Sequence, residues 1–222
     1  MKFFAWLSDL LFPEKCLLCT CVLEEGEVDL CRHCRSHISE CSLPKEKLPF
    51  LDSWLALWYY EGDVRRSLLR YKFHGRQNYA PGYGRLLAMK LLREDWTDYD
   101  LVTYIPISDK RRRKRGFDQV QLLAREVALQ LQLPLVPTLR KVRHNQPQSA
   151  ISGRAHRKAN VLGVYCCLPE ARLQGKRILL LDDIVTTGAT AGEAARILLT
   201  AGASQVHLAV IARANHENQT GR

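Results

Sequence analysis

The chain has 222 residues, of which 46% are hydrophobic and 25% are charged. This composition excludes a disordered or fibrous chain, and no apolar run approaches the roughly 18 residues that a membrane span needs. The net charge of +10 is uneven, since residues 1–60 hold six Lys/Arg and nine Asp/Glu whereas residues 61–222 hold 27 and 14. A basic body favours a polyanionic ligand or partner, either a nucleotide phosphate or a nucleic acid, over plain solvated surface charge.

The first twelve residues, MKFFAWLSDLLF, predict a short amphipathic helix. Its apolar side would hold Phe3, Trp6, Leu7, Leu10 and Leu11. Ser8 and Asp9 interrupt any signal-peptide core, and no small-residue cleavage site follows. We expect a cytoplasmic protein without an integral membrane segment, whose first helix docks on its own chain or lies on a membrane surface.

Six of the eight cysteines lie between positions 16 and 41, and four of them form two C-x2-C pairs. These are Cys16, Cys19, Cys31 and Cys34. Two such pairs predict a closed tetrahedral site for structural Zn²⁺, because soft thiolates suit zinc and a short segment needs the metal to stay folded. Disulfides are disfavoured in the cytosol, and the spacing of Cys21, Cys41, His33 and His37 fits zinc less well.

Alternating strands and helices follow. Apolar periodicity and turn residues predict strands at 51–60, 101–107, 133–139, 163–168, 177–183 and 205–213, and helices at 63–75, 83–94, 116–133 and 189–202. The prediction is an α/β fold, a mostly parallel sheet flanked by helices, with a small zinc-binding module at its N-terminus. The expected divisions are a zinc-ribbon-like module at 1–48, the sheet domain at 49–215 and a flexible tail at 216–222.

The stretch ILLLDDIVTTGAT (178–190) carries the clearest chemical pattern. Asp182 and Asp183 would emerge at the end of a buried strand, which is the ligand edge of a parallel sheet. Thr190 and Glu193 fit a capping box, so the next helix should begin near Thr190 and direct its free N–H groups at a phosphate. Gly188 permits close approach of the backbone. Carboxylates beside a phosphate site suit ribose hydroxyls or Mg²⁺, and a ribose with a 5-phosphate and a 1-diphosphate satisfies every feature.

This stretch closely resembles the 5-phosphoribosyl 1-diphosphate (PRPP) signature of type I phosphoribosyltransferases. The resemblance implies the type I phosphoribosyltransferase fold, PRPP as ligand and Mg²⁺ bound with it. It also implies that Asp182 and Asp183 bind the ribose hydroxyls and are the catalytic acids. The residues that would bind PRPP beside them are Thr186, Thr187, Gly188, Ala189 and Thr190.

Two basic segments complete the expected site. Lys110 to Arg115 are all basic, and the resemblance implies a loop here that binds the diphosphate through Lys110, Arg111 and Arg115. Residues 139–160 read as a long loop with no acid. They would be a flap over PRPP in which Arg143 and Arg157 stabilise the departing diphosphate. The alternative for this segment is a surface loop without a catalytic part.

The whole chain from about Leu11 to Arg213 resembles the ComF family of competence-associated, phosphoribosyltransferase-like bacterial proteins. The motifs are the four-cysteine head, YKFHGR (71–76), RRRKRGFDQ (111–119), the R…Q and R…N spacings at 143–148 and 157–160, and the PRPP signature. The family usually has Asn where Asp118 stands here. A carboxylate at 118 would weaken diphosphate binding if it lies near that group, or serve equally well if it only caps the helix.

The resemblance implies a PRPP-binding protein of DNA uptake and natural transformation that handles internalised single-stranded DNA. It further implies the ComF helicase-like DNA-uptake ATPase as a partner. Tyr71, Phe73, Tyr79 and Tyr83 would stack on bases or belong to the core. The alternative is an active phosphoribosyltransferase that transfers ribose 5-phosphate to a nitrogen acceptor. No general base is evident, because Thr186 stands where purine-type relatives carry Asp.

Overall fold

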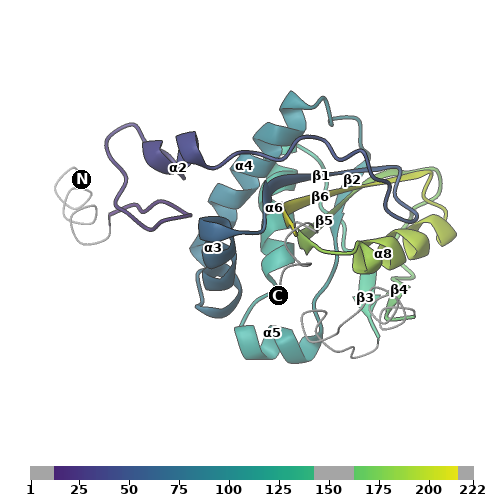
Figure 1. Cartoon of the computed structure of the whole chain (residues 1–222). Helices are drawn as coiled ribbons and strands as arrows, with labels where there is room; N and C mark the ends of the chain where they lie inside the picture. The colour runs from purple at the N-terminus through teal and green to yellow at the C-terminus, as the bar shows by residue number, and fades with distance from the viewer. Residues whose placement is uncertain (1–12, 143–162, 215–222) are drawn as a thin grey trace, which may run out of the picture.

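The computed structural model describes residues 13–142 and 163–214 (Figure 1). The predicted helix at 1–12, the flap residues Arg143 and Arg157 and the tail at 216–222 lie outside these residues. Among the described helices, none combines the length and apolar character that crossing a bilayer requires.

One parallel sheet forms the centre of the chain. The strands of the described residues are β1 Ser53–Tyr59, β2 Leu101–Tyr104, β3 Leu139–Lys141, β4 Tyr165–Cys167, β5 Arg177–Val185 and β6 Gln205–Arg213. The central sheet has the order β1-β6-β5-β2, and each neighbouring pair is parallel. Strands β3 and β4 form a separate antiparallel pair. The prediction of an α/β fold with a mostly parallel sheet is confirmed.

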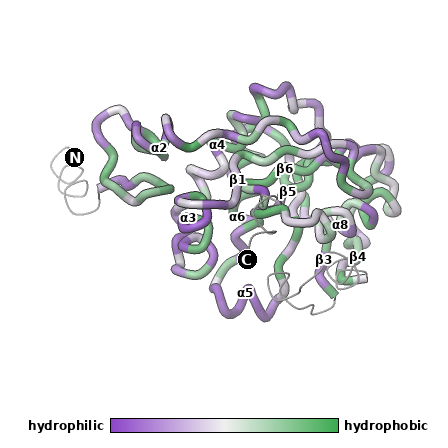
Figure 2. The backbone as a smooth tube through the Cα atoms, in the orientation of Figure 1, coloured by the Kyte–Doolittle hydropathy of each residue, from purple (hydrophilic) through white to green (hydrophobic). Residues whose placement is uncertain are grey.

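Helices cover both faces of this sheet (Figure 1). They are α2 Arg32–His37, α3 Gly62–Phe73, α4 Ala80–Arg93, α5 Asp109–Arg115, α6 Gln119–Leu131 and α8 Ala189–Thr200, with a 3-10 turn at Gln77–Tyr79. Helices α3, α4 and α6 share one hydrophobic core with the sheet, and α8 with the β3–β4 pair shares a second. Along β5, Leu179 and Leu181 enter the first core, whereas Ile178 and Leu180 enter the second. Figure 2 shows the apolar strands between these layers and the hydrophilic α5 outside them.

Two local predictions are wrong. Residues 133–138 form no regular strand, because prolines at 134 and 137 remove two N–H donors, and Leu135 makes only an isolated bridge to Val102. Leu139 instead begins β3, which extends to Lys141 into the segment predicted as a loop. The basic run from Lys110 to Arg115 is the helix α5 and not a loop. The hydroxyl of Ser108 caps its first turn, and Gly116 ends it at a φ of +82°.

The sequence analysis assigned four aromatic residues either to the core or to base stacking, and the structure separates them into two groups. Tyr71, Tyr79 and Tyr83 are buried in the core on the side of α3, α4 and α6. Phe73 is 61% exposed at the end of α3, and the guanidinium of Arg115 lies 4.8 Å from the centre of its ring. Only Phe73 among the four can therefore contact a base without unfolding of the core.

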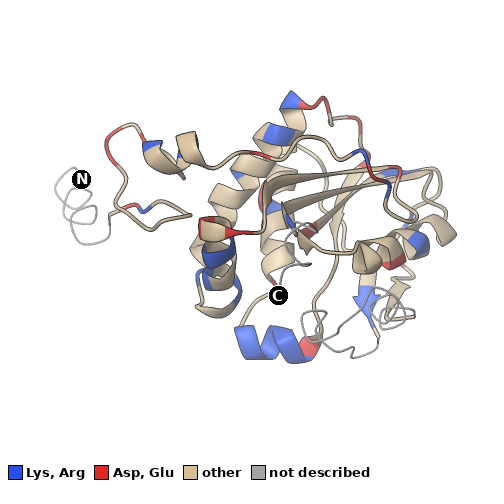
Figure 3. Cartoon of the chain, in the orientation of Figure 1, with Lys and Arg blue, Asp and Glu red and all other residues tan. Residues whose placement is uncertain are grey.

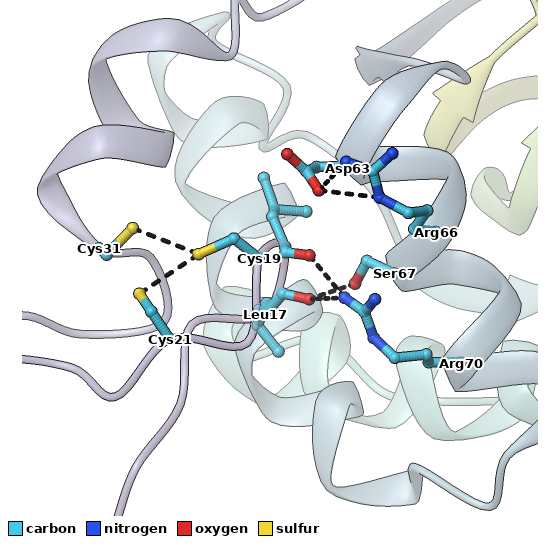
Figure 4. A network of polar contacts seen from close by, with 9 residues as sticks. Leu17, Cys19, Cys21, Cys31, Asp63, Arg66, Ser67 and Arg70 are labelled. Atoms are coloured by element: carbon cyan, nitrogen blue, oxygen red, sulfur yellow. Dashed lines mark hydrogen bonds and ion pairs between the residues drawn. The ribbon is translucent and has the colours of Figure 1, made fainter.

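The N-terminal module packs on α3 and α4. The carbonyl oxygen of Leu17 accepts hydrogen bonds from the Ser67 hydroxyl and from the Arg70 guanidinium, the latter at 3.3 Å (Figure 4). Arg85 of α4 pairs with Asp29 at 2.5 Å. Leu17 also belongs to the same hydrophobic core as α3 and α4. The module is thus fastened to the sheet domain by both apolar and polar contacts.

Candidate functional site

The two adjacent acids of the signature lie inside β5, which runs two residues past the end of the predicted strand at 177–183. β5 continues to Val185 and pairs with β6 over its whole length, up to Val185 with Arg213. Its ladder with β2 stops at Leu181. Among the described residues, β5 therefore has a strand partner on one side only at the position of the acids. This position is near the carboxyl ends of the parallel strands, where such sheets bind ligands.

Because successive side chains of a strand point to opposite faces, Asp182 and Asp183 face different layers. Asp183 follows Leu181 onto the face covered by α3 and α6, where its Oδ1 accepts from Lys72 Nζ at 2.8 Å and its Oδ2 from Gln119 Nε2 at 2.7 Å. The side chain is only 8% exposed. Asp183 is thus a buried carboxylate with a partner on each oxygen.

Asp182 belongs to the other face and is partly exposed. Its Oδ1 accepts the backbone N–H of Asp183 at 2.8 Å. Burial, and then the charge of Asp183, raise its pKa to about 8. Lys141 on β3 shares these surroundings, and burial followed by repulsion from Arg111 lowers its pKa to about 8, against the opposing effect of Asp182. This face therefore holds an acid and a lysine that both titrate near neutral pH.

The loop after β5 leads directly into α8. Gly188 is the N-cap residue at a φ of +72°, the helix begins at Ala189, and Gly188 offers no side-chain cap. The predicted Thr190–Glu193 capping box is wrong, because Glu193 accepts from the backbone N–H of Gly163 at 2.9 Å and pairs with Arg196 at 2.8 Å. An N-terminus without a side-chain cap keeps its N–H groups and its dipole for an anion.

Two polar atoms of this region are buried without a partner among the described residues: Oε1 of Gln119 and Oγ1 of Thr187. Gln119 lies against Asp183, and Thr187 lies in the loop before α8. A hydroxylated, phosphorylated ligand carries the donors and acceptors that such groups need. The partly exposed carboxylate of Asp182 offers hard oxygen atoms of the kind that Mg²⁺ takes as ligands.

The basic helix α5 presents two of its arginines to the site. Arg111 and Arg115, one helical turn apart, are the partly buried members of the run, whereas Lys110 is exposed. Burial lowers the pKa of Arg115, and the charge of Asp183 opposes this shift. On the other face, the positive charge of Arg111 adds to the effect of burial and lowers the pKa of Lys141. Figure 3 shows this concentration of positive charge on α5.

Asp118 has the capping role. Its Oδ1 accepts the backbone N–H groups of Val120 at 2.9 Å and Gln121 at 3.2 Å, and its Oδ2 accepts that of Ile107 at 3.0 Å. Desolvation raises its pKa, while these N–H donors lower it. The carboxylate thus starts α6 and ties it to the segment after β2, which is the second of the two roles considered for it.

The sequence analysis did not predict three residues near the acids as site residues. They are Lys72, Gln119 and Lys141. Lys72 and Gln119 occur in the YKFHGR and RGFDQ motifs, which were noted only for their resemblance. Their contacts with Asp183 span 111 and 64 residues of sequence. Local periodicity does not predict contacts between residues so far apart in sequence. The two motifs were the only sequence signal for Lys72 and Gln119.

The cysteines of the N-terminal module form one cluster. The sulfur atoms of Cys16, Cys19, Cys21 and Cys31 lie within 4.8 Å of one another. Cys34 borders the same cluster, since its backbone N–H donates to Cys31 Sγ at 3.4 Å and its thiol is 1% exposed. Sulfurs around one tetrahedral zinc lie roughly 3.8 Å apart, so a cluster of this size can hold a metal ion, consistent with zinc.

Comparisons with known proteins show which domain and which relatives this chain resembles. The sequence model of the family described as Phosphoribosyl transferase domain matches residues 121–220. The DNA utilization protein YhgH of Escherichia coli (strain K12) is 26% identical over 90% of this chain and 97% of its own. Competence protein F of Haemophilus influenzae is 23% identical over 83% and 84%, and competence protein ComFC of Streptococcus pneumoniae is 29% identical over 68% and 64%.

Among solved structures, an adenine phosphoribosyltransferase is 16% identical over 65% of this chain and 75% of its own, with a TM-score of 0.40. The parallel sheet, the loop between β5 and α8 and the domain match define a phosphoribosyltransferase-type domain of type I fold, with a cysteine cluster at the N-terminus. Within that class, the chain is similar over most of its length to the competence and DNA-utilization proteins just named.

The raised pKa of Asp182 makes the stability of the fold depend on pH. An acid with a higher pKa in the folded chain contributes stability that is complete below about pH 4 and is lost as the pH rises to about 8. Asp182→Asn removes this penalty, so its free energy of unfolding should exceed that of the parent chain at pH 8.5, and by a smaller margin at pH 6. Urea unfolding at the two pH values measures the difference. Asp109→Asn, at an exposed carboxylate, is the control, and an equal gain at both pH values would contradict the assignment.

Metal analysis of the cysteine cluster tests its ligands. We expect one zinc per chain, with Cys16, Cys19 and Cys31 as ligands and Cys34 as the fourth, because Cys34 is buried whereas Cys21 is exposed. Cys34→Ser should lose most of the zinc and Cys21→Ser should keep it, as measured by elemental analysis of protein purified under reducing conditions. The reverse result would make Cys21 the fourth ligand.

Proposed function

We propose that this chain binds PRPP with Mg²⁺ at the carboxyl end of β5 and acts in the cytoplasm as a phosphoribosyltransferase-like protein of DNA uptake. The supporting observation is the arrangement of the acids of β5 beside the uncapped N-terminus of α8. Asp182 would accept hydrogen bonds from the ribose hydroxyls, and Thr186 to Thr190 would bind the 5-phosphate. The free thiols of the described cysteines suit a reducing compartment.

The basic side chains near the acids would suit the diphosphate group of PRPP. Arg111 and Arg115 of α5, with Lys141 of β3, lie on the side of the acids where a diphosphate needs counter-charges. Mg²⁺, when bound with the ligand, would supply further neutralisation of the diphosphate. The exposed Lys110 would contribute at longer range, and Arg143 and Arg157 of the flap remain part of the proposal.

Calorimetry with PRPP tests this function. The parent chain should bind PRPP in the presence of Mg²⁺, and Asp182→Asn should weaken binding about 10- to 100-fold, because hydrogen bonds to a charged acceptor contribute roughly 1.5–3 kcal/mol. Asp98→Asn, an exposed acid that pairs with Arg177 at the opposite end of β5, should bind like the parent.

No binding at millimolar PRPP would refute the proposal. Release of diphosphate with a nitrogen acceptor would place the chain among active phosphoribosyltransferases. Binding without any release would leave it as a PRPP-dependent binding protein.

The exposed surface of α5 favours single-stranded DNA as a further ligand. No residue of α5 is buried, so Arg112 and Arg113 are available to phosphates, and the exposed ring of Phe73 lies beside Arg115. Basic side chains next to an exposed aromatic ring are the usual elements of sequence-tolerant strand binding. A DNA-uptake ATPase of the helicase-like ComF type is the protein partner that the family resemblance implies.

Fluorescence anisotropy with a labelled oligothymidine measures this binding. Phe73→Ala should weaken it about 5- to 100-fold through loss of stacking, and affinity should fall steeply with salt. The double variant Arg112→Ala/Arg113→Ala should reduce the steepness of that salt dependence. Phe50→Ala, at another exposed ring, is the control. If affinity does not fall with salt and is unchanged in Phe73→Ala, this surface is excluded as the binding site for single-stranded DNA.

A further inference from the structure

A groove follows the junction between the N-terminal module and helix α4 (Figure 1). It encloses a cavity of about 240 Å³. The module and α4 both supply its walls, which include Val28, Arg35, Arg85, Leu86, Met89 and Leu92. The groove lies apart from the acids of β5, since none of its lining residues contacts Asp182 or Asp183 through a hydrogen bond or ion pair within the described chain.

The apolar walls of this groove are open to solvent in the described structure. Val28 is 52% exposed, Met89 48% and Leu92 52%, and Leu86 is partly buried. Residues 86, 89 and 92 are spaced three apart on α4, so they form one apolar stripe along the helix. A contiguous exposed apolar patch with charged side chains beside it is typical of a docking surface.

The chain carries a segment that matches this surface. Residues 1–12 lie outside the described residues, and their sequence predicts an amphipathic helix with Trp6 and Leu10 on its apolar side. Because a cavity of roughly 150 Å³ holds a benzene molecule, the larger cavity here has room for an aromatic side chain such as Trp6. Asp9 is the one acid of the segment and borders its apolar side, where it would face the exposed Arg35 of the groove.

The start of the described chain places this segment within reach of the groove. The backbone N–H of Leu17 donates to the carbonyl oxygen of Asp29 at 2.8 Å, and Asp29 also lines the groove. The five residues from Leu17 back to Phe12 span at most about 18 Å when extended. A helix of twelve residues is about 18 Å long, which is shorter than the 14-residue α4. Residues 1–12 can therefore lie along the apolar stripe of α4.

We propose that residues 1–12 dock as an amphipathic helix in the groove between the N-terminal module and α4, with Trp6 in its cavity. The short connection to Leu17 gives the segment a high effective concentration at its own groove, which favours this groove over that of a second copy at micromolar protein. The side chains of the segment include one Lys and one Asp, so they carry no net charge that would attract them to anionic lipid. The docked helix would hold the module and α4 together from the outside.

Digestion of the full chain with chymotrypsin, which cleaves after accessible aromatic residues, tests the docking. Cleavage within residues 1–12 of the parent chain should be slow, because the segment must leave the groove before it is cut. Met89→Asp and Leu92→Asp each place a charge in the apolar groove and should speed this cleavage about 10- to 100-fold. Mass spectrometry of the products locates the cut and gives its rate. Both side chains are about half exposed, so the two variants should keep the fold of α4.

Three further variants assign the effect to this contact. Phe50→Asp changes another exposed apolar side chain, in the segment next to α8, and should be cleaved within residues 1–12 like the parent. Leu10→Asp alters the segment itself and should release it as Met89→Asp does. The double variant Leu10→Asp/Met89→Asp should then be cleaved no faster than the faster single variant, because both changes remove one shared contact.

The proposal is overturned if the parent is cleaved within residues 1–12 as fast as Met89→Asp, or if Phe50→Asp shows the same acceleration. Light scattering on the same samples distinguishes a second copy as the occupant. Protection that is lost on dilution together with dissociation of a dimer would assign the groove to the segment of a second copy and refute docking within one chain. Protection that appears only when phosphatidylglycerol vesicles are added would place the segment on a membrane surface and refute it as well.

Discussion

The alternation of side chains along β5 determines how this site is built. Two consecutive acids in a central strand must face opposite layers, so each meets a different environment. Asp183 enters the layer of α3 and α6, where a carboxylate without partners would cost several kcal/mol, and Lys72 and Gln119 remove that cost. Asp182 enters the layer of β3–β4 and α8 and keeps a raised pKa. The acid pair is thus one carboxylate paired on both oxygens inside the fold and one partly exposed carboxylate with a raised pKa.

Helix α3 connects this pair to the N-terminal module. Ser67 and Arg70 hold the carbonyl oxygen of Leu17, and Lys72 follows less than one turn later on the same helix. Because a helix moves largely as a unit, a module that loses its metal and loosens from Ser67 and Arg70 also frees the segment that places Lys72. The N-terminal module therefore supports more than its own short segment, even though its helix α2 lies away from β5 (Figure 1).

The sequence predicted what depends on local pattern. The apolar run before Asp182 gave a central parallel strand, and the residues after it gave the loop and helix of a phosphate site. Helix α5 was missed although Ser108 and Gly116 are its local start and stop signals, because the basic run was interpreted through its resemblance to a loop. The capping box failed because Arg196 and the N–H of Gly163 take Glu193, and no local pattern reveals those competitors.

The loop between β5 and α8 also packs against the chain that follows the N-terminal module. A Cβ added at Gly188 would lie 2.5 Å from Cδ2 of Leu48, and one added at Gly192 would lie 2.9 Å from the carbonyl oxygen of Pro49. Gly188 therefore allows the positive φ at the start of α8, and both glycines allow residues 48–49 to pack closely against that helix. Helix α3 contacts Asp183 through Lys72, and residues 48–49 contact the start of α8, so segments from the first third of the chain support both β5 and the loop that follows it. Its composition, acidic where the rest is basic, then reflects docking on the sheet domain, as the Asp29–Arg85 pair illustrates, and not a separate anion-binding role.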